Sequence, residues 1–162
     1  SDMTIKVGEK IPSVTLHTME NGSVNAITTE DLFKGKKVVL FALPGAFTPT
    51  CSARHLPGFI DKSDDLKKKG VDSIVCLSVN DAFVMDAWGK DRGANDKVKM
   101  IADGNADFSK AVGLTMDGTG YGMGVRAQRY AMVVEDGVVK TLNVEEPGAF
   151  EVSSAEAVLK VL

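Results

Sequence analysis

The sequence has 162 residues, of which 44% are hydrophobic and 25% are charged, a balance typical of a globular domain with a substantial core. Its formal net charge of −3 gives no electrostatic reason to expect nucleic acid or an anionic membrane as a partner. No apolar run approaches the ~20 residues that a membrane span requires. We therefore expect neither class of partner.

Only two cysteines occur, Cys51 and Cys76, too few for a small secreted scaffold held together by disulfides. A reducing compartment fits this usage better, and no apolar signal segment is visible, so we expect a cytoplasmic protein. Ser1-Asp2 before Met3 resembles a cloning remnant, which leaves a single expected domain over residues 4–162. A targeting peptide removed during cloning would leave no trace in this sequence.

The first half of the chain alternates predicted strands and helices. Asn21-Gly22 favours the positive φ angles of a tight hairpin turn between residues 14–18 and 23–25. The almost wholly apolar stretch 36–43 predicts a strand buried on both faces. The other expected elements are a short helix from Thr28 or Thr29 through Phe33, and a helix from Cys51 to Lys69, kinked at Pro57-Gly58 and closed by Gly70.

The second half continues the alternation and ends in a hairpin. A strand over 71–79 carries Cys76, and a Gly-rich stretch over 114–124 is expected to be irregular. This order predicts a three-layer α/β domain with a mixed sheet. The other expected elements are a helix capped by Asn80 or Asp81 and running to Lys90, a strand over 98–102, a helix over 107–112, a hairpin of 129–134 with 138–144 turning at Asp136-Gly137, and a last helix opened by Ser153 with Glu156 at capping-box spacing. The expected core positions include Phe83, Ala87, Trp88 and Met132.

The most informative stretch is the loop Pro44–Cys51, which directly follows a predicted buried strand. Its two prolines each fix a backbone φ angle, so the loop is held before any substrate arrives. Thr48 is close enough in such a loop for its hydroxyl to bond the Cys51 sulfur or a bound oxygen. The N–H groups of Thr50 and Cys51, at the start of the next helix, favour an anionic sulfur or a polarised oxygen. The pattern therefore predicts a reactive thiolate at Cys51.

A positive charge near the sulfur is also expected, because a neighbouring cation stabilises a thiolate. Arg126 and Arg129 stand at the head of the predicted strand 129–134, and the topology places them best for this purpose. A solvated surface charge is the competing interpretation of each arginine.

Pro44-x-x-x-Thr48-x-x-Cys51 matches the active-site pattern of the peroxiredoxins, and the stretch 44–59 closely resembles their type II (five-type) branch. The likeness covers nearly the whole chain and continues at 77–83, 87–89, 100–103, 129–134 and 142–145. The resemblance implies a thioredoxin-like fold, with a central mixed sheet flanked by helices. It also implies a thiol-dependent peroxidase that reduces hydrogen peroxide and alkyl hydroperoxides, with no metal and no bound organic cofactor.

The resemblance assigns roles to individual residues. Cys51 becomes the peroxidatic cysteine, whose thiolate attacks a peroxide oxygen and becomes a sulfenic acid. Arg129, and not Arg126, matches the active-site arginine of the family, while Pro44 shields the thiolate. The expected substrate-binding groups are Thr48, Thr50, Cys51 and Arg129, which stabilise the charge that spreads over sulfur and oxygen in the transition state.

Cys76 lies in the apolar stretch Ile74–Leu77, where a free cysteine ordinarily packs as a small hydrophobe. The alternative is a resolving cysteine that forms a disulfide with Cys51 after local unfolding. Some type II members carry a resolving cysteine near the C-terminus, but residues 147–154 contain none. The resemblance then favours recycling by glutathione or glutaredoxin, with thioredoxin as the other reductant.

His55 lies four residues after Cys51, on the same face of the expected helix. We expect it to line or support the pocket, with the nucleophile pair of a hydrolase as the alternative. The stretch Cys51–Arg54 is not Cys-x-x-Cys, and the cysteines and histidines lack the close pairing of a zinc site. The glycines at 118–124 lack the Gly-Lys-Ser/Thr of a phosphate loop.

The resemblance also suggests a homodimer, with Phe47 and the Gly-rich segment as candidate contacts. Phe47 is in addition a candidate for pocket support. A second hypothesis, from a different class, is a redox sensor that binds a partner protein and is switched by oxidation of Cys51.

Overall fold

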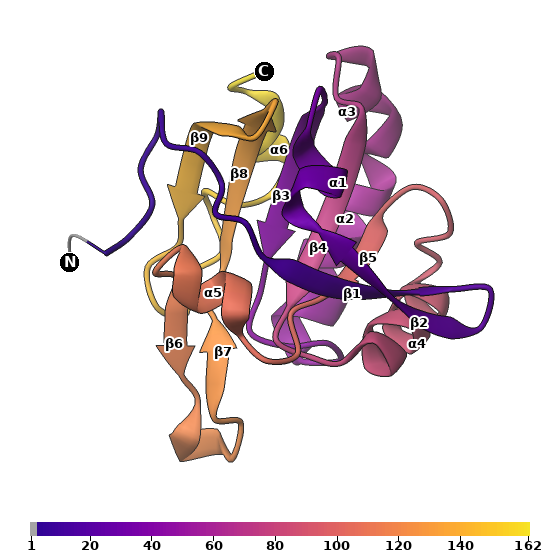
Figure 1. Cartoon of the computed structure of the whole chain (residues 1–162), viewed down its shortest axis with the longest axis vertical. Coiled ribbons are helices and arrows are strands. Elements are labelled where there is room, and N and C mark those ends of the chain that lie inside the picture. The colour runs from indigo at the N-terminus through magenta and orange to yellow at the C-terminus, as the bar shows by residue number, and fades with distance from the viewer. Residues whose placement is uncertain (1–2) are drawn as a thin grey trace.

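A mixed sheet of seven strands forms the middle layer of the protein, which the computed structural model describes over residues 3–162 (Figure 1). The expected remnant, Ser1-Asp2, lies outside the described residues. The strands of this sheet are β1 (Thr15–Glu20), β2 (Ser23–Thr28), β3 (Lys37–Ala42), β4 (Ser73–Ser78), β5 (Lys99–Ala102), β8 (Tyr130–Glu135) and β9 (Val138–Val144). Their order is β2-β1-β5-β4-β3-β8-β9. The three central strands are parallel and the outer strands pair antiparallel.

Helices cover both faces of the sheet, so the three expected layers are confirmed (Figure 1). Four helices and the turn that bears Cys51 pack on one face: α2 (Leu56–Asp61), α3 (Ser63–Lys68), α4 (Ala82–Arg92) and α6 (Ala155–Leu159). The opposite face is covered by α1 (Thr29–Phe33) and α5 (Asp107–Ala111). The hydrophobic core is therefore divided by the sheet into two clusters.

β3 is buried on both faces, as the apolar stretch 36–43 predicted, and so is β4. Val39 and Phe41 point into the cluster under α2, while Val38 and Leu40 point into the opposite cluster. Cys76 on β4 pairs with Phe41, and Ile74 pairs with Val39. Cys76 therefore points into the same cluster under α2 as Val39 and Phe41. The sheet thus places the second cysteine beneath the helix layer that carries the first.

Several local signals in the sequence are confirmed. The hairpin of β1 and β2 turns at Asn21 and Gly22, whose φ angles are 51° and 80°. Of the two threonines that could cap α1, Thr28 does so, and it forms a capping box with Asp31. Asp81, rather than Asn80, caps α4 by accepting the Val84 N–H at 2.8 Å.

The helix expected from Cys51 to Lys69 is divided into three parts. Its first turn, Cys51–His55, is a π-helix in which the Leu56 N–H bonds the Cys51 carbonyl. The next residue, Pro57, has no N–H to donate to the carbonyl four positions earlier, and its ring would clash with that carbonyl in a regular α-helix. The wider π-helical turn before Pro57 relieves this clash. A second interruption lies at Lys62, between α2 and α3. Pro57 and Gly58 themselves lie inside α2.

The expectation of an irregular Gly-rich segment is wrong. Residues 114–124 contain β6 (Thr115–Asp117) and a short 3₁₀ turn, and β6 pairs antiparallel with β7 (Val125–Ala127). Gly122 and Gly124 adopt φ angles of 70° and 64°, which the hairpin needs to reverse its direction. Figure 1 shows this hairpin projecting from the body of the molecule.

Three further expectations are corrected. Ser154, not Ser153, caps α6, because the Ser154 hydroxyl accepts the Ala157 N–H at 3.1 Å. Trp88 and Met132 are buried as expected, but Phe83 is 65% exposed and Ala87 is also exposed. Met85 and Trp88 on the opposite side of α4 are the residues that pack in the core, so an apolar side chain alone does not mark the buried side of this helix.

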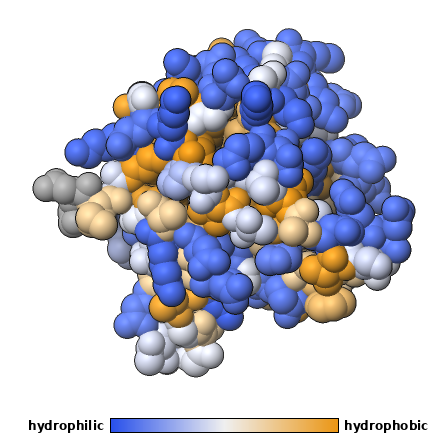
Figure 2. All heavy atoms as spheres, in the orientation of Figure 1, coloured by the Kyte–Doolittle hydropathy of each residue, from blue (hydrophilic) through white to orange (hydrophobic). Residues whose placement is uncertain are grey.

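Hydrophilic side chains cover most of the face seen in Figure 2, and hydrophobic residues show along a central band. Among residues 3–162, every helix is too short or too polar to cross a bilayer.

Candidate active site

Cys51 lies at the start of the π-helical turn, and its side chain is 0% exposed. The preceding loop leaves the end of β3 and carries the sequence pattern of prolines and threonines that predicted a reactive cysteine. The sulfur is therefore buried within the helix layer and faces the sheet. Its chemistry depends on which polar groups reach it from neighbouring elements.

Arg129 supplies the expected cation. It immediately precedes β8, and its Nη2 lies 3.1 Å from the Cys51 sulfur. A guanidinium is a donor only, so it can donate to the sulfur and stabilise the negative charge of a thiolate. Arg126, the other candidate, lies on β7 and bonds backbone carbonyls instead.

His55 holds the other side of the guanidinium. Arg129 Nη1 donates to His55 Nδ1 at 2.8 Å, and His55 Nε2 lies 3.0 Å from the Ser153 carbonyl, which can only accept. The imidazole is therefore neutral, with its proton on Nε2. Burial, and then the charge of Arg129, lower the pKa of His55 to about 3, although its bond to Ser153 acts in the opposite direction. Both ring nitrogens of His55 are thus occupied by Arg129 and Ser153, and neither bonds the Cys51 sulfur.

A strap of residues 145–153 completes this arrangement. The Glu145 carboxylate accepts the Glu151 N–H and the Ser153 N–H, both at 2.8 Å, and the Ser153 hydroxyl at 2.7 Å. Burial alone would raise the pKa of Glu145, but these hydrogen bonds outweigh it and hold the pKa below its usual range. We call Cys51, Arg129, His55, Ser153 and Glu145 the arginine network. It joins the Cys51 sulfur to the end of β9.

Sequence reasoning missed Glu145 and Ser153 as members of this network. Ser153 was assigned to a helix cap, and nothing in the spacing of Glu145 indicates that it binds residues six and eight positions later. The available signal was chemical. A carboxylate that follows a strand and precedes a loop can bind free backbone N–H groups. Its position in the sequence does not identify which N–H groups it binds.

Thr48 is oriented by the loop that contains it. Its hydroxyl donates to the Gly45 carbonyl at 2.7 Å, and its backbone N–H approaches the same oxygen at 3.4 Å. The sulfur of Cys51 receives no hydrogen bond from this hydroxyl. Since the single hydroxyl proton is used, Thr48 offers only its oxygen lone pairs to a further partner.

Phe47 lies between the two ends of this turn, with a φ angle of 63° that is uncommon for a residue with a side chain. Its ring is 53% exposed and its centroid is 6.4 Å from that of Trp88. Trp88 in turn donates its indole N–H to the Ser52 hydroxyl at 2.9 Å. The residue after Cys51 is therefore bonded to α4.

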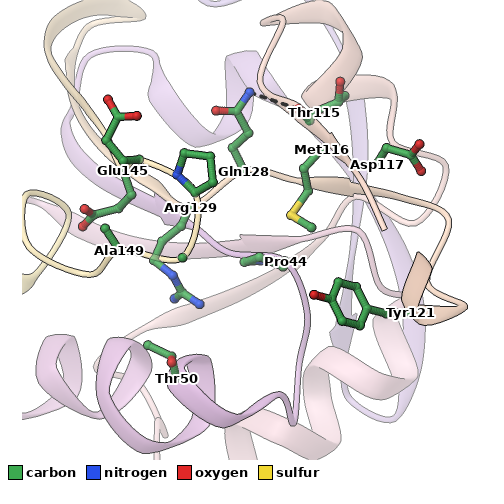
Figure 3. A pocket seen from close by; sticks show the side chains of 13 residues that line it. Pro44, Thr50, Thr115, Met116, Asp117, Tyr121, Gln128, Arg129, Glu145 and Ala149 are labelled. Atoms are coloured by element: carbon green, nitrogen blue, oxygen red, sulfur yellow. Dashed lines mark hydrogen bonds between the residues drawn. The ribbon is translucent and has the colours of Figure 1, made fainter. Parts of the chain in front are cut away.

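A cavity of about 630 Å³ opens beside the arginine network. Figure 3 shows the Arg129 guanidinium pointing toward Thr50, with Pro44 close by and Met116 and Tyr121 on the side of the β6–β7 hairpin. Cys51, Thr48, His55 and Phe47 do not line this cavity. Arg129 therefore reaches from the cavity wall to the sulfur, and Thr50 and Pro44 also line the cavity. The complete lining is Pro44, Thr50, Thr115, Met116, Asp117, Tyr121, Gln128, Arg129, Glu145, Glu146, Pro147, Gly148 and Ala149.

Cys76 is fully buried on β4, between Phe41 of β3 and Met100 of β5. Burial, with a smaller contribution from Cys51, raises the pKa of its thiol well above the ordinary value. Both cysteines are free thiols. Across residues 3–162, no group of three or more cysteine, histidine or acidic side chains could hold a metal ion.

Comparison with known proteins finds relatives over almost the whole chain. A profile of the Redoxin family matches residues 6–159. Peroxiredoxin-2E, chloroplastic, from Arabidopsis thaliana is 52% identical over 163 residues, which cover 98% of this chain and 70% of that protein. Peroxiredoxin-2B from Arabidopsis thaliana is 48% identical over 159 residues, which cover 98% of each chain. The crystal structure of reduced Prx3 from Vibrio vulnificus in complex with H₂O₂ is 53% identical, covers 98% of this chain and 99% of that chain, and superposes with a TM-score of 0.94.

Proposed function

We propose a peroxide-reducing cycle at Cys51 for this chain, which belongs to the peroxiredoxins of the Redoxin family and has their thioredoxin-like fold. Family membership supports thiol peroxidase activity. In this chain, the observation that carries the proposal is the contact of 3.1 Å between Arg129 Nη2 and the Cys51 sulfur. A charge-assisted hydrogen bond of this kind favours the thiolate, which is the nucleophilic form of cysteine.

The first chemical step is a displacement at oxygen. The Cys51 thiolate attacks one oxygen of a hydroperoxide, a sulfur–oxygen bond forms, and the oxygen–oxygen bond breaks. The leaving oxygen departs as water or an alcohol after it gains a proton, and Cys51 is oxidised to a sulfenic acid. Negative charge moves from sulfur onto the leaving oxygen, so the Arg129 guanidinium stabilises both ends of the path.

Thr48 has a defined role in this step. Because its own proton is given to the Gly45 carbonyl, its oxygen can accept the O–H of the incoming hydroperoxide. That bond would orient the peroxide so that an oxygen faces the sulfur. Pro44 and Thr50 line the cavity beside Arg129, which supports a shielding role for Pro44 and a place for Thr50 on the approach.

Hydrogen peroxide and alkyl hydroperoxides are the proposed substrates, and glutathione with glutaredoxin is the proposed reductant. A thiol attacks the sulfenic acid, water leaves, and a mixed disulfide forms that a second thiol reduces. The burial of Cys76 between two strands supports an external reductant over an internal disulfide. Thioredoxin is the alternative, and it requires Cys76 to leave the sheet and resolve Cys51.

A homodimer and a cytoplasmic location complete the proposal. Three exposed aromatic side chains support the dimer: Phe47, Phe83 and Tyr121 are 53%, 65% and 83% exposed. Light scattering that gives the mass of one chain would contradict it. The two free cysteines support a reducing compartment. The relatives named as chloroplastic make a plastid the alternative, which localisation of the tagged full-length protein would distinguish.

The experiment is the intact mass of the reduced protein after one equivalent of hydrogen peroxide, followed by turnover with each reductant. A gain of one to three oxygens, with turnover on glutathione and glutaredoxin, supports the cycle. A loss of two hydrogens within one chain would identify a Cys51–Cys76 disulfide and a thioredoxin-type reductant. Rapid oxidation of Cys51 without turnover on any reductant would favour a redox sensor.

A further inference from the structure

Two side chains outside the arginine network hold the turn that orients Thr48. The turn runs from Pro44 to Thr48, and its Gly45 carbonyl receives the Thr48 hydroxyl proton. Asn80 follows β4 and Arg126 lies on β7, so the two side chains reach the turn from different elements. Neither has a role in the cycle described above.

Asn80 fixes the peptide unit whose carbonyl binds Thr48. The Ala46 N–H donates to Asn80 Oδ1 at 2.9 Å, and this N–H belongs to the same planar peptide as the Gly45 carbonyl. The Ser78 hydroxyl donates to the same Asn80 oxygen at 2.7 Å, which holds the amide in place. Because the peptide is planar, fixing its N–H also fixes the direction of its carbonyl.

Arg126 fixes the preceding peptide unit. Its Nη1 lies 3.3 Å from the Pro44 carbonyl, and its Nε donates to the Met123 carbonyl at 2.9 Å. The guanidinium packs so closely on the turn that a Cβ added to Gly45 would lie 2.9 Å from Nη1. No carboxylate among the described residues pairs with Arg126, so its donors serve the backbone.

We infer that Asn80 and Arg126 are positioning residues for the peroxidase reaction: they clamp two successive peptides of the turn, and through the Gly45 carbonyl they aim the Thr48 oxygen at the hydroperoxide. The positive φ angle of Phe47 shows why clamps are needed, since a strained residue persists only where its surroundings determine it. This inference rests on the proposed function, because it concerns how Thr48 binds the substrate of that reaction.

The test compares two reactions of the same sulfur in Asn80→Ala and Arg126→Met. Oxidation by hydrogen peroxide needs Thr48, whereas alkylation by iodoacetamide needs only the thiolate that Arg129 stabilises. Oxidation is followed by stopped-flow fluorescence of Trp88, which is bonded to the residue after Cys51, and alkylation by peptide mass across pH. We expect each variant to slow oxidation about tenfold and to change the rate and pH profile of alkylation by less than about twofold.

Conservative variants and matched controls sharpen the comparison. Asn80→Asp keeps an acceptor for the Ala46 N–H, and Arg126→Lys keeps one donor, so we expect both to recover part of the ratio of the oxidation rate to the alkylation rate. Exposed Asn25 lies on the edge strand β2 and exposed Arg92 ends α4, and neither bonds the turn, so Asn25→Ala and Arg92→Met should leave the ratio unchanged. If Asn80→Ala does not fold, Asn80→Ser provides the same contrast.

Equal slowing of both reactions would overturn the inference, because it would show a general structural effect on Cys51. Unchanged oxidation in Asn80→Ala and Arg126→Met would also overturn it. Failure of the proposed function has a different signature, since the unmodified protein would then show no rapid oxidation by hydrogen peroxide.

Discussion

Cys51 and Cys76 have the same exposure and opposite surroundings. Both side chains are 0% exposed, and both belong to the core cluster on the same side of the sheet. Cys51 begins a π-helical turn, and a guanidinium reaches its sulfur at 3.1 Å. Cys76 lies within a parallel strand between two other strands, and no side chain in the described part of the protein donates a hydrogen bond to its sulfur.

The difference shows that burial alone does not decide whether a cysteine is reactive. Burial disfavours a thiolate at Cys76, and no donor among the described residues opposes this effect, so the pKa of this thiol is raised. At Cys51 the protein supplies a cation that is itself held by neutral His55 and by the strap anchored on Glu145. The reactivity that we propose for Cys51 would therefore depend on a second layer of groups that orient the cation.

The largest expected effect comes from removing the Cys51 sulfur. We predict that Cys51→Ser reduces peroxidase turnover to the rate of the uncatalysed reaction, because serine is a far weaker nucleophile and cannot form a sulfenic acid. Steady-state peroxide consumption with glutathione and glutaredoxin measures this. Retained turnover in a folded Cys51→Ser protein would move the reaction to another group and remove the contrast between the two cysteines.

The next effect comes from the cation. We predict that Arg129→Met slows oxidation of Cys51 by hydrogen peroxide by about 10² to 10³-fold, the usual cost of losing one preorganised donor at a developing charge. It should also slow alkylation by iodoacetamide, since the thiolate itself loses its partner. Single-turnover rates measured beside those of Arg92→Met would show the effect, and equal rates in the two variants would contradict it.

The sequence predicted the main elements of this fold because each carries a local signal. The apolar run before Pro44, the Asn21-Gly22 turn and the threonine cap of α1 each depend on nearby residues, and each is confirmed. The prediction for the Gly-rich segment failed because its two strands are only three residues long, which is too short for an alternating pattern to be recognised. The prediction that Phe83 belongs to the core failed because the face that a helix buries depends on tertiary packing.

The site was predictable only where the chemistry is local. The loop from Pro44 to Cys51 is one continuous motif, and the resemblance to a family selected Arg129. The contacts of Glu145 with Ser153, and of Asn80 with the Ala46 N–H, join residues whose partners are set by the path of the chain in space. No periodicity or spacing rule encodes such contacts, so they become visible only in the structure.

A smaller effect on rate, with a distinct pH signature, is expected at His55. We predict that His55→Phe slows oxidation of Cys51 by about 10 to 10²-fold, because Arg129 loses the acceptor that holds it. The pKa of His55 is about 3 in the folded protein, while an unfolded histidine titrates near 6.5. Between these values the unfolded chain binds more protons at His55, so this residue makes folding less favourable as pH falls below 6.5 and has no such effect above it.

Urea unfolding at several pH values tests this sign. From pH 7 to pH 4.5, the unmodified protein should lose on the order of 3 kcal/mol more of its unfolding free energy than His55→Phe, because the variant has no imidazole to protonate. The carboxylates titrate in both proteins, so the difference isolates His55. Parallel curves for the two proteins would show that His55 is not held neutral.

The smallest effect on turnover is expected at Cys76. We predict that Cys76→Ala changes turnover with glutathione and glutaredoxin by less than about twofold, because no hydrogen bond among the described residues joins its sulfur to the arginine network. Cys76→Ser should be similar in rate but less stable by about 1 to 3 kcal/mol, since its hydroxyl would be buried between strands. Loss of turnover in both variants, with unfolding curves that show both still folded, would mean that Cys76 leaves the sheet to resolve Cys51. The two cysteines would then be successive partners in one cycle, and the strand around Cys76 would have to open during each turnover.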